Sequence, residues 1–355
     1  MKIILVIVHH RPERSPGQRF RFEQYMDFLA QNGYKIIFSN LISEQDDAIY
    51  YSKGKYFKKF CLIIKYFFHR LNDLKLAQKS DIVFIYREAF MLGTTFFEKR
   101  FAKTKAKIIF DFDDAIWLND TSDANKRVSW LKNPKKTEKI CKLSDLVIAG
   151  NQYLANYAQQ FNNNVKIIPT TLNLIINNNP KNPNSKLCIG WTGSDTTLKH
   201  FYFAIPLLKK LKEKFGEKIY FKVIANRYEK QSELEVKFSK WTKETEIKDI
   251  LEFDIGIMPL PDDKWSKGKC GFKGLQCMAL KIPVVMSAVG VNCDIIQSGE
   301  NGYLATSEQE WFDCLSELIV SEELRKKIGE KGFLTVKEKY SFDAWKDRYL
   351  ELFSN

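Results

Sequence analysis

The feature that most constrains this chain is a repeated alternation of short apolar runs with amphipathic stretches. The first half carries such runs at residues 2–8, 35–39, 81–87, 107–114 and 145–150. Apolar runs rich in β-branched residues are typical of parallel strands that are buried on both faces. Stretches with helical spacing separate them; one, at residues 19–33, ends in a glycine of the kind that terminates helices. We therefore predict βα units wound into a parallel sheet.

The same pattern begins again after an Asn- and Pro-rich stretch, with apolar runs at residues 187–193, 219–225, 255–260 and 282–287. A length of 355 residues suits two domains. We predict an α/β chain with two Rossmann-like, doubly wound parallel sheets that face a central cleft. The expected division is an N-terminal domain at 1–176 with a returning helix at 340–355, a linker at 177–185, and a C-terminal domain at 186–339.

Composition excludes several classes of protein. Hydrophobic residues make up 45% and charged residues 28%, an ordinary globular balance, and no apolar run approaches the length of a transmembrane helix. The apolar start of the chain is too short for a signal peptide and fits a first strand. Seven cysteines and four histidines show no metal-binding spacing. We expect reduced thiols, no metal and a cytoplasmic protein at the inner face of the membrane.

Positive charge is concentrated in the first half. Residues 1–170 hold 28 Lys and Arg against 17 Asp and Glu, whereas the remainder holds 28 against 26. An anionic partner of the first half is therefore expected. Residues 53–75 combine helical aromatic spacing with many lysines, so we predict peripheral contact with an anionic membrane. The alternative is a helix that packs on the sheet with its lysines outward.

A second basic stretch, residues 267–285, places three lysines and three glycines just before a predicted helix and strand. Glycines let a backbone approach a ligand closely, and a helix beginning near Gly271 or Phe272 directs its free N–H groups outward. Lys269 and Lys273, together with Lys267, add fixed positive charge. We predict an anion site that suits a diphosphate, and the alternative is a solvated lysine loop that caps a core helix.

These residues resemble the signature of the retaining GT-B glycosyltransferases of family 4, also called group 1. Residues 253–285 carry GKxGFKxLQxMA, similar to a bacterial branch that makes polysaccharides and glycans. The resemblance extends over residues 15–33, 108–117, 189–200 and 300–304. It implies a GT-B fold and the transfer of a sugar from a nucleotide-diphosphate sugar to a glycan or lipid-linked acceptor. It also implies anomeric retention, with the nucleotide sugar as co-substrate and neither a metal nor another cofactor.

The resemblance also implies roles for individual residues. The family's ribose-binding glutamate corresponds to Gln276, whose amide can still hydrogen-bond a ribose. The preceding glutamate corresponds to Gly268, which lacks the carboxylate. The family's diphosphate-binding lysine corresponds to Lys199, whereas its arginine position is Ser194, so Lys269 or Lys273 is expected to replace that charge. Further donor-binding positions are Gly17, Gly193, Pro259, Gly271 and Phe272.

Polar residues at strand ends in the first half are the remaining candidates. His10, Arg19 and Arg21 lie near the first βα turn, where we expect the acceptor or an anion; the alternative is a plain helix cap. Asp113 and Asp114 follow a predicted strand and are expected to face a sugar. Loop capping and a metal site of the GT-A kind are the alternatives. Stabilisation of the departing diphosphate is assigned to the lysines.

Three other functions fit parts of the sequence. A nucleotide-sugar epimerase or hydrolase would keep the fold and need no acceptor. A nucleic-acid-binding protein would use the basic first half, although no recognition motif supports it. An inactive binding protein would explain why Gly268 and Ser194 stand where charged residues are expected.

Overall fold

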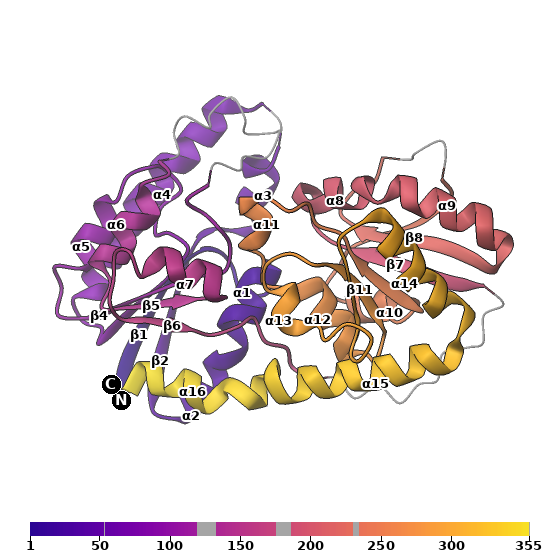
Figure 1. The fold of residues 1–355 in the computed structure, drawn as a ribbon. Coiled ribbons are helices and arrows are strands. Elements are labelled where there is room, and N and C mark those ends of the chain that lie inside the picture. Colours follow the sequence, from indigo (N-terminus) through magenta and orange to yellow (C-terminus); the bar gives the residue numbers. More distant parts are fainter. Residues whose placement is uncertain (53, 119–132, 175–185, 230–233, 355) are drawn as a thin grey trace. The chain divides into compact units, whose positions relative to one another are not determined.

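The computed structural model describes residues 1–52, 54–118, 133–174, 186–229 and 234–354, so the predicted linker lies outside the described residues. The chain divides into two compact units, Met1–Thr171 with Trp345–Asn355, and Leu172–Ala344. Each unit contains one six-stranded parallel sheet with helices on its faces, as Figure 1 shows. The predicted α/β class with two Rossmann-like sheets is confirmed.

The sheet of the N-terminal unit has the strand order β2-β1-β3-β4-β5-β6, and every neighbouring pair is parallel. β1 lies between β2 and β3, and its residues 4–8 are all buried, as expected of a strand covered on both faces. The strands are β1 (Lys2–His10), β2 (Tyr34–Ile42), β3 (Ile82–Tyr86), β4 (Lys107–Phe112), β5 (Leu146–Ala149) and β6 (Val165–Ile167).

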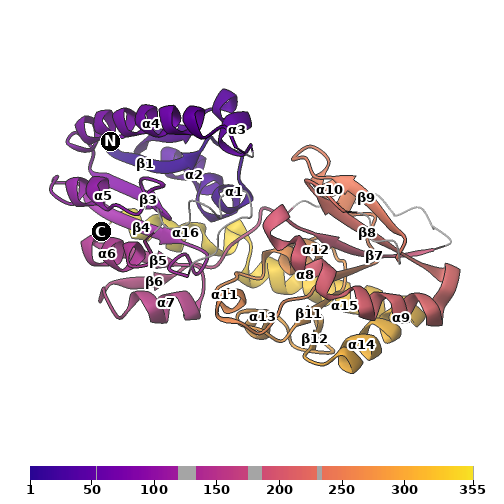
Figure 2. The ribbon, with the colours of Figure 1, turned by 90° about the horizontal axis from the view of Figure 1, so that it is seen from above.

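Helices lie on both faces of this sheet, as the second view makes clear (Figure 2). The chain's last helix joins this unit: Tyr349 stacks on Tyr25 with 4.1 Å between ring centroids, and Lys107 Nζ donates to the Leu352 carbonyl at 3.0 Å. The helices are α1 (Pro16–Arg21), α2 (Met26–Gln31), α3 (Glu44–Tyr50), α4 (Tyr56–Ala77), α5 (Phe96–Phe101), α6 (Lys136–Leu143), α7 (Gln152–Ala158) and α16 (Phe342–Ser354).

The sheet of the C-terminal unit has the order β12-β11-β10-β7-β8-β9 and is also parallel throughout. Gly190 on β7 allows the Phe253 ring to pack directly on the strand, since a Cβ there would lie 2.1 Å from that ring. The strands are β7 (Leu187–Thr192), β8 (Ile219–Ala225), β9 (Val236–Lys240), β10 (Ile255–Met258), β11 (Val284–Ser287) and β12 (Tyr303–Ala305).

The helices of the C-terminal unit connect these strands and extend to the end of the unit. They are α8 (Leu198–Phe203), α9 (Ile205–Phe215), α10 (Glu246–Ile250), α11 (Lys264–Lys267), α12 (Phe272–Ala279), α13 (Asn292–Ile295), α14 (Glu308–Val320) and α15 (Glu322–Lys339). Two 3-10 turns, at Asp195–Thr197 and Gly216–Lys218, precede α8 and β8 respectively.

The strand order fixes where a ligand of the C-terminal sheet would bind. The chain starts this sheet at β7, proceeds to β8 and β9, and then crosses back to β10 on the other side of β7. Ligands of doubly wound sheets bind at the carboxyl ends of the strands that flank such a switch point. Here those are the ends of β7 and β10, which Gly193 and Pro259 immediately follow.

Candidate functional site

Lys273, in the first turn of α12, is held by two contacts at the end of β7. Its Nζ donates a hydrogen bond to Thr197 Oγ1 at 3.0 Å and lies 4.3 Å from the centroid of the Trp191 ring. Trp191 is buried on β7, so it forms a rigid support for the lysine stem. Lys273 is therefore a positioned cation, which argues against the alternative of a solvated loop lysine.

One buried histidine lies within electrostatic reach of three lysines. His200 on α8 has 3% of its surface exposed, and its pKa is lowered from 6.5 to about 4. Burial is the largest cause, followed by the positive charges of Lys273, Lys199 and Lys269. These three side chains come from two different helices and a loop, yet all lie close enough to act on the same imidazole. The structure thus brings together the three lysines that the sequence singled out.

The environments of the other two lysines differ from that of Lys273. Lys199 is exposed on α8, whereas Lys269 lies over the Trp265 ring at 4.8 Å. Lys267 forms an ion pair with Asp262 at 3.0 Å. Lys199 is thus exposed, whereas Lys269 and Lys273 are both half-buried and each lies over a tryptophan ring.

Two glycines allow this arrangement. Gly271 has a φ of +67°, and a Cβ on it would lie 2.3 Å from Ile295 Cδ1. It caps α12, which begins at Phe272 as expected. Gly193, just after β7, leaves room for the cluster, since a Cβ there would lie 2.7 Å from Lys273 Nζ. The N-terminus of α12 and the lysines therefore face the same edge of the sheet, an arrangement that suits an anion.

The position at which the family has an arginine is occupied by a hydroxyl-rich turn. Ser194 is exposed, and its backbone N–H donates to Thr197 Oγ1 at 3.1 Å, while Thr197 Oγ1 donates to the Ser194 carbonyl at 3.0 Å. Thr197 therefore fixes both this turn and the ammonium group of Lys273. Sequence reasoning missed Thr197 and Trp191, because neither stands in a motif that marks a lysine-holding residue.

Gln276 lies one turn further along α12 and contacts a carboxylate that the sequence did not reveal. Its Nε2 donates to Glu246 Oε1 at 3.0 Å, and Trp241 Nε1 donates to the same oxygen at 3.1 Å. Gln276 and Glu246 are both buried, with 5% and 3% of their surfaces exposed. Glu246 begins α10, thirty positions before Gln276, so no local spacing connects the two residues.

Three more residues that the sequence singled out, Pro259, Gly268 and Phe272, lie in the C-terminal unit. Pro259 directly follows β10 and is buried, and the next residue, Leu260, donates its backbone N–H to Ser287 Oγ at 2.8 Å. Gly268 is buried at the end of α11. Phe272 is half-buried as the first residue of α12. The structure places these residues in the same unit as the lysine cluster.

In the N-terminal unit, Asp113 and Asp114 are held by an arginine. Arg87 Nε donates to Asp113 Oδ1 at 2.9 Å, its NH2 donates to Asp114 Oδ2 at 2.7 Å, and the Tyr86 hydroxyl donates to Asp113 Oδ1 at 2.8 Å. Burial raises the pKa of Asp113, but Arg87 and Arg21 outweigh it and the net shift is downward. Gly17 lies against this network, since a Cβ on it would be 2.4 Å from the Tyr86 hydroxyl.

Arg21 does not occupy the position expected of an acceptor-binding residue. Its guanidinium is fully buried and forms a bidentate pair with Asp111, with Nε–Oδ1 at 3.1 Å and NH2–Oδ2 at 2.8 Å. A third donor, NH1, bonds to the Ile168 carbonyl. Arg21 is therefore a residue of the buried core of the N-terminal unit. Arg19 remains half-buried, with its guanidinium 4.8 Å from the Phe20 ring centroid.

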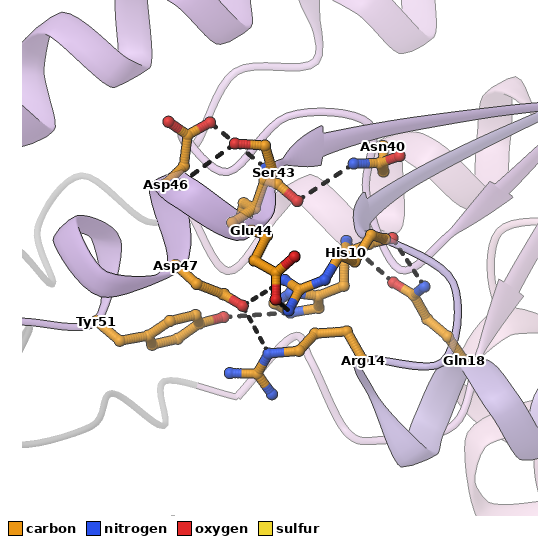
Figure 3. Close-up of polar contacts among 11 residues, drawn as sticks. His10, Arg14, Gln18, Asn40, Ser43, Glu44, Asp46, Asp47 and Tyr51 are labelled. Atoms are coloured by element: carbon orange, nitrogen blue, oxygen red, sulfur yellow. Dashed lines mark hydrogen bonds and ion pairs between the residues drawn. The ribbon is translucent and has the colours of Figure 1, made fainter. Parts of the chain in front are cut away.

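His10 ends β1 within a polar network that Figure 3 shows in detail. Gln18 holds its backbone at both the N–H, at 3.1 Å, and the carbonyl, at 3.0 Å, while His10 Nε2 lies 3.2 Å from the Tyr51 hydroxyl. Nearby, Asp47 accepts from Arg14 Nε at 2.8 Å. Burial lowers the pKa of His10 to about 4, and Arg14 adds to this shift. His10 is thus a neutral imidazole at physiological pH.

Two further expectations bear on metals and membranes. In the part of the chain that the structure describes, no three His, Cys, Asp or Glu side chains lie together in a way that would hold a metal ion. None of the described helices is both long enough and apolar enough to span a bilayer.

The C-terminal unit matches a known family. Residues 187–321, less than half of the chain, match the family model described as glycosyl transferases group 1. The matched segment includes the lysine cluster, Gln276 and Glu246. No curated protein sequence matches the chain.

Several solved structures resemble nearly the whole chain in fold, although their sequence identity to it is low. Sucrose-phosphate synthase from Thermosynechococcus elongatus has a TM-score of 0.71 at 12% identity, covering 99% of this chain and 98% of its own. Anabaena Alr3699/HepE in complex with UDP-glucose has a TM-score of 0.67 at 14% identity, covering 100% and 99%.

A third solved structure is longer than this chain. A TarM mutant from S. aureus, in complex with fondaparinux, alpha-GlcNAc-glycerol and UDP, has a TM-score of 0.59 at 17% identity. The likeness covers 79% of this chain and 59% of TarM, so this chain spans less than two thirds of the length of TarM. At such identities a likeness establishes the fold. The chain therefore has the GT-B fold, and its residues 187–321 match the group 1 glycosyl transferases.

Proposed function

We propose that this protein is a retaining glycosyltransferase that moves a sugar from a nucleotide-diphosphate sugar to a glycan or lipid-linked acceptor, without a metal or other cofactor. The product would belong to a cell-surface polysaccharide or glycoconjugate. The observation that carries the proposal is the position of Lys273, which Thr197 and Trp191 hold at the carboxyl edge of a doubly wound sheet. The lysines around His200 make this edge cationic.

The chemistry that this cluster can perform is the stabilisation of a leaving group. As the bond between the sugar's anomeric carbon and the diphosphate oxygen breaks, the electron pair stays with the diphosphate while the sugar gains oxocarbenium character. Donors that are already fixed stabilise this developing charge without having to reorganise. Lys273, its neighbouring lysines and the first N–H groups of α12 are such donors. The acceptor hydroxyl then forms the new glycosidic bond, and its proton passes to the departing diphosphate.

The neighbours support the substrate class. HepE is in complex with UDP-glucose, and TarM with UDP and two glycan-like molecules. The family match covers the segment that contains the lysines. A nucleotide-sugar donor and a glycan acceptor are therefore the partners we propose for this chain.

We further propose that the protein binds the inner face of a membrane through one side of α4, which would suit a lipid-linked acceptor. The large apolar side chains on this helix point outward: the exposed fraction is 77% for Phe57, 61% for Phe60, 43% for Ile64 and 61% for Phe68. We call these four residues the α4 ridge. An exposed apolar ridge of this size marks an interaction surface.

The opposite side of α4 explains why the ridge faces outward. Arg70 and Asp73 are buried there, with Arg70 NH1 donating to Asp73 at 2.6 Å and Arg70 Nε donating to the Ala89 carbonyl at 2.7 Å. Lysines flank the ridge at positions 55, 58, 65 and 75, all exposed. Aromatic side chains with surrounding lysines match the surface of an anionic bilayer. Phe67, on the same helix, packs inward on Phe97 with 5.2 Å between ring centroids.

The proposal is tested by a panel of nucleotide sugars, scored for binding and slow hydrolysis, with and without a membrane lipid extract. A transferase is expected to release nucleoside diphosphate faster when the extract supplies its acceptor. If the extract leaves the rate unchanged and the sugar is recovered epimerised or hydrolysed, the protein is instead an epimerase or a hydrolase. Salt-sensitive binding of oligonucleotides, without affinity for any nucleotide sugar, would contradict the proposal.

A further inference from the structure

A buried carboxylate contacts the residue that lies one helical turn beyond Lys273 on α12. Lys273 and Gln276 are three positions apart on α12 and therefore share one face of that helix, about 5–6 Å apart. Gln276 donates to Glu246 Oε1, and Trp241 donates to the same atom. Trp241 directly follows β9, and its backbone N–H bonds to the Ala225 carbonyl at 2.9 Å, so this group belongs to the same edge of the sheet as the lysines.

A carboxylate that is 97% buried requires an explanation, because removing a charge from water is costly unless hydrogen bonds compensate for it. The amide of Gln276 and the indole of Trp241 both reach Oε1 and fix the plane of the carboxylate. An ionised carboxylate has two oxygens with about four acceptor positions. Neighbouring hydroxyl groups of a ligand are donors that suit such a group.

We propose that Glu246 accepts hydrogen bonds from the ribose hydroxyls of the nucleotide, and that Gln276 is a positioning residue that orients this carboxylate. The inference rests on the proposed function, because it assumes that Lys273 binds the diphosphate. In a nucleoside diphosphate the ribose is joined to the phosphate through one methylene group. Placing the phosphates at Lys273 therefore puts the ribose about one helical turn away, near Gln276 and the carboxylate to which it donates.

The same geometry explains why position 276 is an amide. A glutamate there would place a second carboxylate about 3 Å from Glu246, and like charges at that distance oppose each other's ionisation. An amide instead donates to Glu246 at 3.0 Å. The acidic group of this site thus stands on α10, and α12 contributes the donor that holds it.

The experiment compares ribonucleoside diphosphates with ligands that lack the ribose hydroxyls. Calorimetry with UDP, GDP and ADP identifies the base that the wild-type protein binds best. The same titration is repeated with the 2′,3′-dideoxy form of that nucleotide and with inorganic pyrophosphate. Glu246→Gln is expected to weaken the ribonucleotide about 10- to 100-fold, since hydrogen bonds to a charged group are lost. Binding of pyrophosphate and of the dideoxy nucleotide should stay within about twofold.

Two variants separate this role from a structural one. Gln276→Leu should cause a smaller loss, confined to the ribonucleotide. If circular dichroism shows that Glu246→Gln does not fold, Glu246→Asp is used in its place, because it keeps the charge and shortens the side chain. The ratio of the affinity for the ribonucleotide to that for the dideoxy nucleotide should then fall below the wild-type ratio. A variant that keeps the wild-type ratio overturns the role of Glu246. A wild-type protein that binds none of the three nucleoside diphosphates instead overturns the proposed function.

Discussion

Replacing Lys273 by methionine removes one charge while keeping the length of the side chain. The methionine keeps a side chain of similar length beside the Trp191 ring, over which the lysine ammonium now lies. What disappears is the ammonium group, which donates to Thr197 Oγ1 at 3.0 Å. The substitution therefore separates the electrostatic role of this residue from its packing role.

The expected losses in stability and in rate differ in size. The hydrogen bond to Thr197 is worth about 1 kcal/mol of unfolding free energy, and the contact with the Trp191 ring about 0.5–1 kcal/mol at a partly exposed site. Lys273→Met should thus lower the stability of the fold by no more than about 2 kcal/mol. Loss of one preorganised donor at a developing charge costs about 3 kcal/mol of transition-state stabilisation, or roughly a hundredfold in turnover.

The assay measures release of nucleoside diphosphate from the best nucleotide sugar, alongside urea unfolding of the same preparation. Lys326→Met is the matched control, because Lys326 forms an exposed ion pair with Glu322 on α15, and such pairs contribute about 0–1 kcal/mol. The control should turn over at the wild-type rate. Wild-type turnover by folded Lys273→Met would refute the assignment of this lysine to the diphosphate.

Three further predictions concern other parts of the chain. Arg21→Leu should destabilise the protein by about 3–5 kcal/mol in urea unfolding, because Asp111 keeps a buried charge; restored stability in the double variant with Asp111→Leu would show that the pair itself is dispensable. The double variant Phe57→Ser, Phe60→Ser should sediment less with anionic vesicles than the wild-type protein does. Val320→Ser, at a similarly exposed position on α14, should sediment as the wild type does. An equal loss in both variants would contradict membrane binding through the α4 ridge. Folding lowers the pKa of His200 from 6.5 to about 4, so the unfolded chain binds the proton more tightly than the folded one. The stability of the protein should therefore decrease as the pH is lowered from 6.5 to 4. His200→Gln should reduce this pH dependence, as measured by the midpoints of urea unfolding.

The fold could be predicted because burial on both faces leaves a clear pattern. The run that became β1 is apolar at every position from Ile4 to Val8, which only a covered parallel strand tolerates. The orientation of α4 could not be predicted in the same way. Its buried face carries Arg70 and Asp73, and these charges are tolerated inside because Ser39, Val8 and each other supply hydrogen bonds. Partners from distant strands leave no signal in the sequence of the helix.

The candidate site shows the same division. Lys273 and Gly271 could be chosen because lysines and glycines crowd one short stretch before a helix. Glu246 and Thr197 could not, because they approach α12 only through the folding of other βα units. Arg21 was chosen for its charge beside a predicted loop, but a charged residue near a strand end can equally be a core ion pair, and spacing does not distinguish the two.

The lysine cluster itself is the strongest argument for an anionic ligand. Positive charges that share one environment repel one another, and the three lysines add to the effect of burial in lowering the pKa of His200. Surface lysines that serve only solubility have no reason to converge, and they pair readily with nearby acids, as Lys326 does with Glu322. Lys273 is positioned by the Thr197 hydroxyl and the Trp191 ring, which come from the end of β7 and the turn that follows it. A diphosphate carries enough negative charge to balance the lysines that converge at this edge of the sheet.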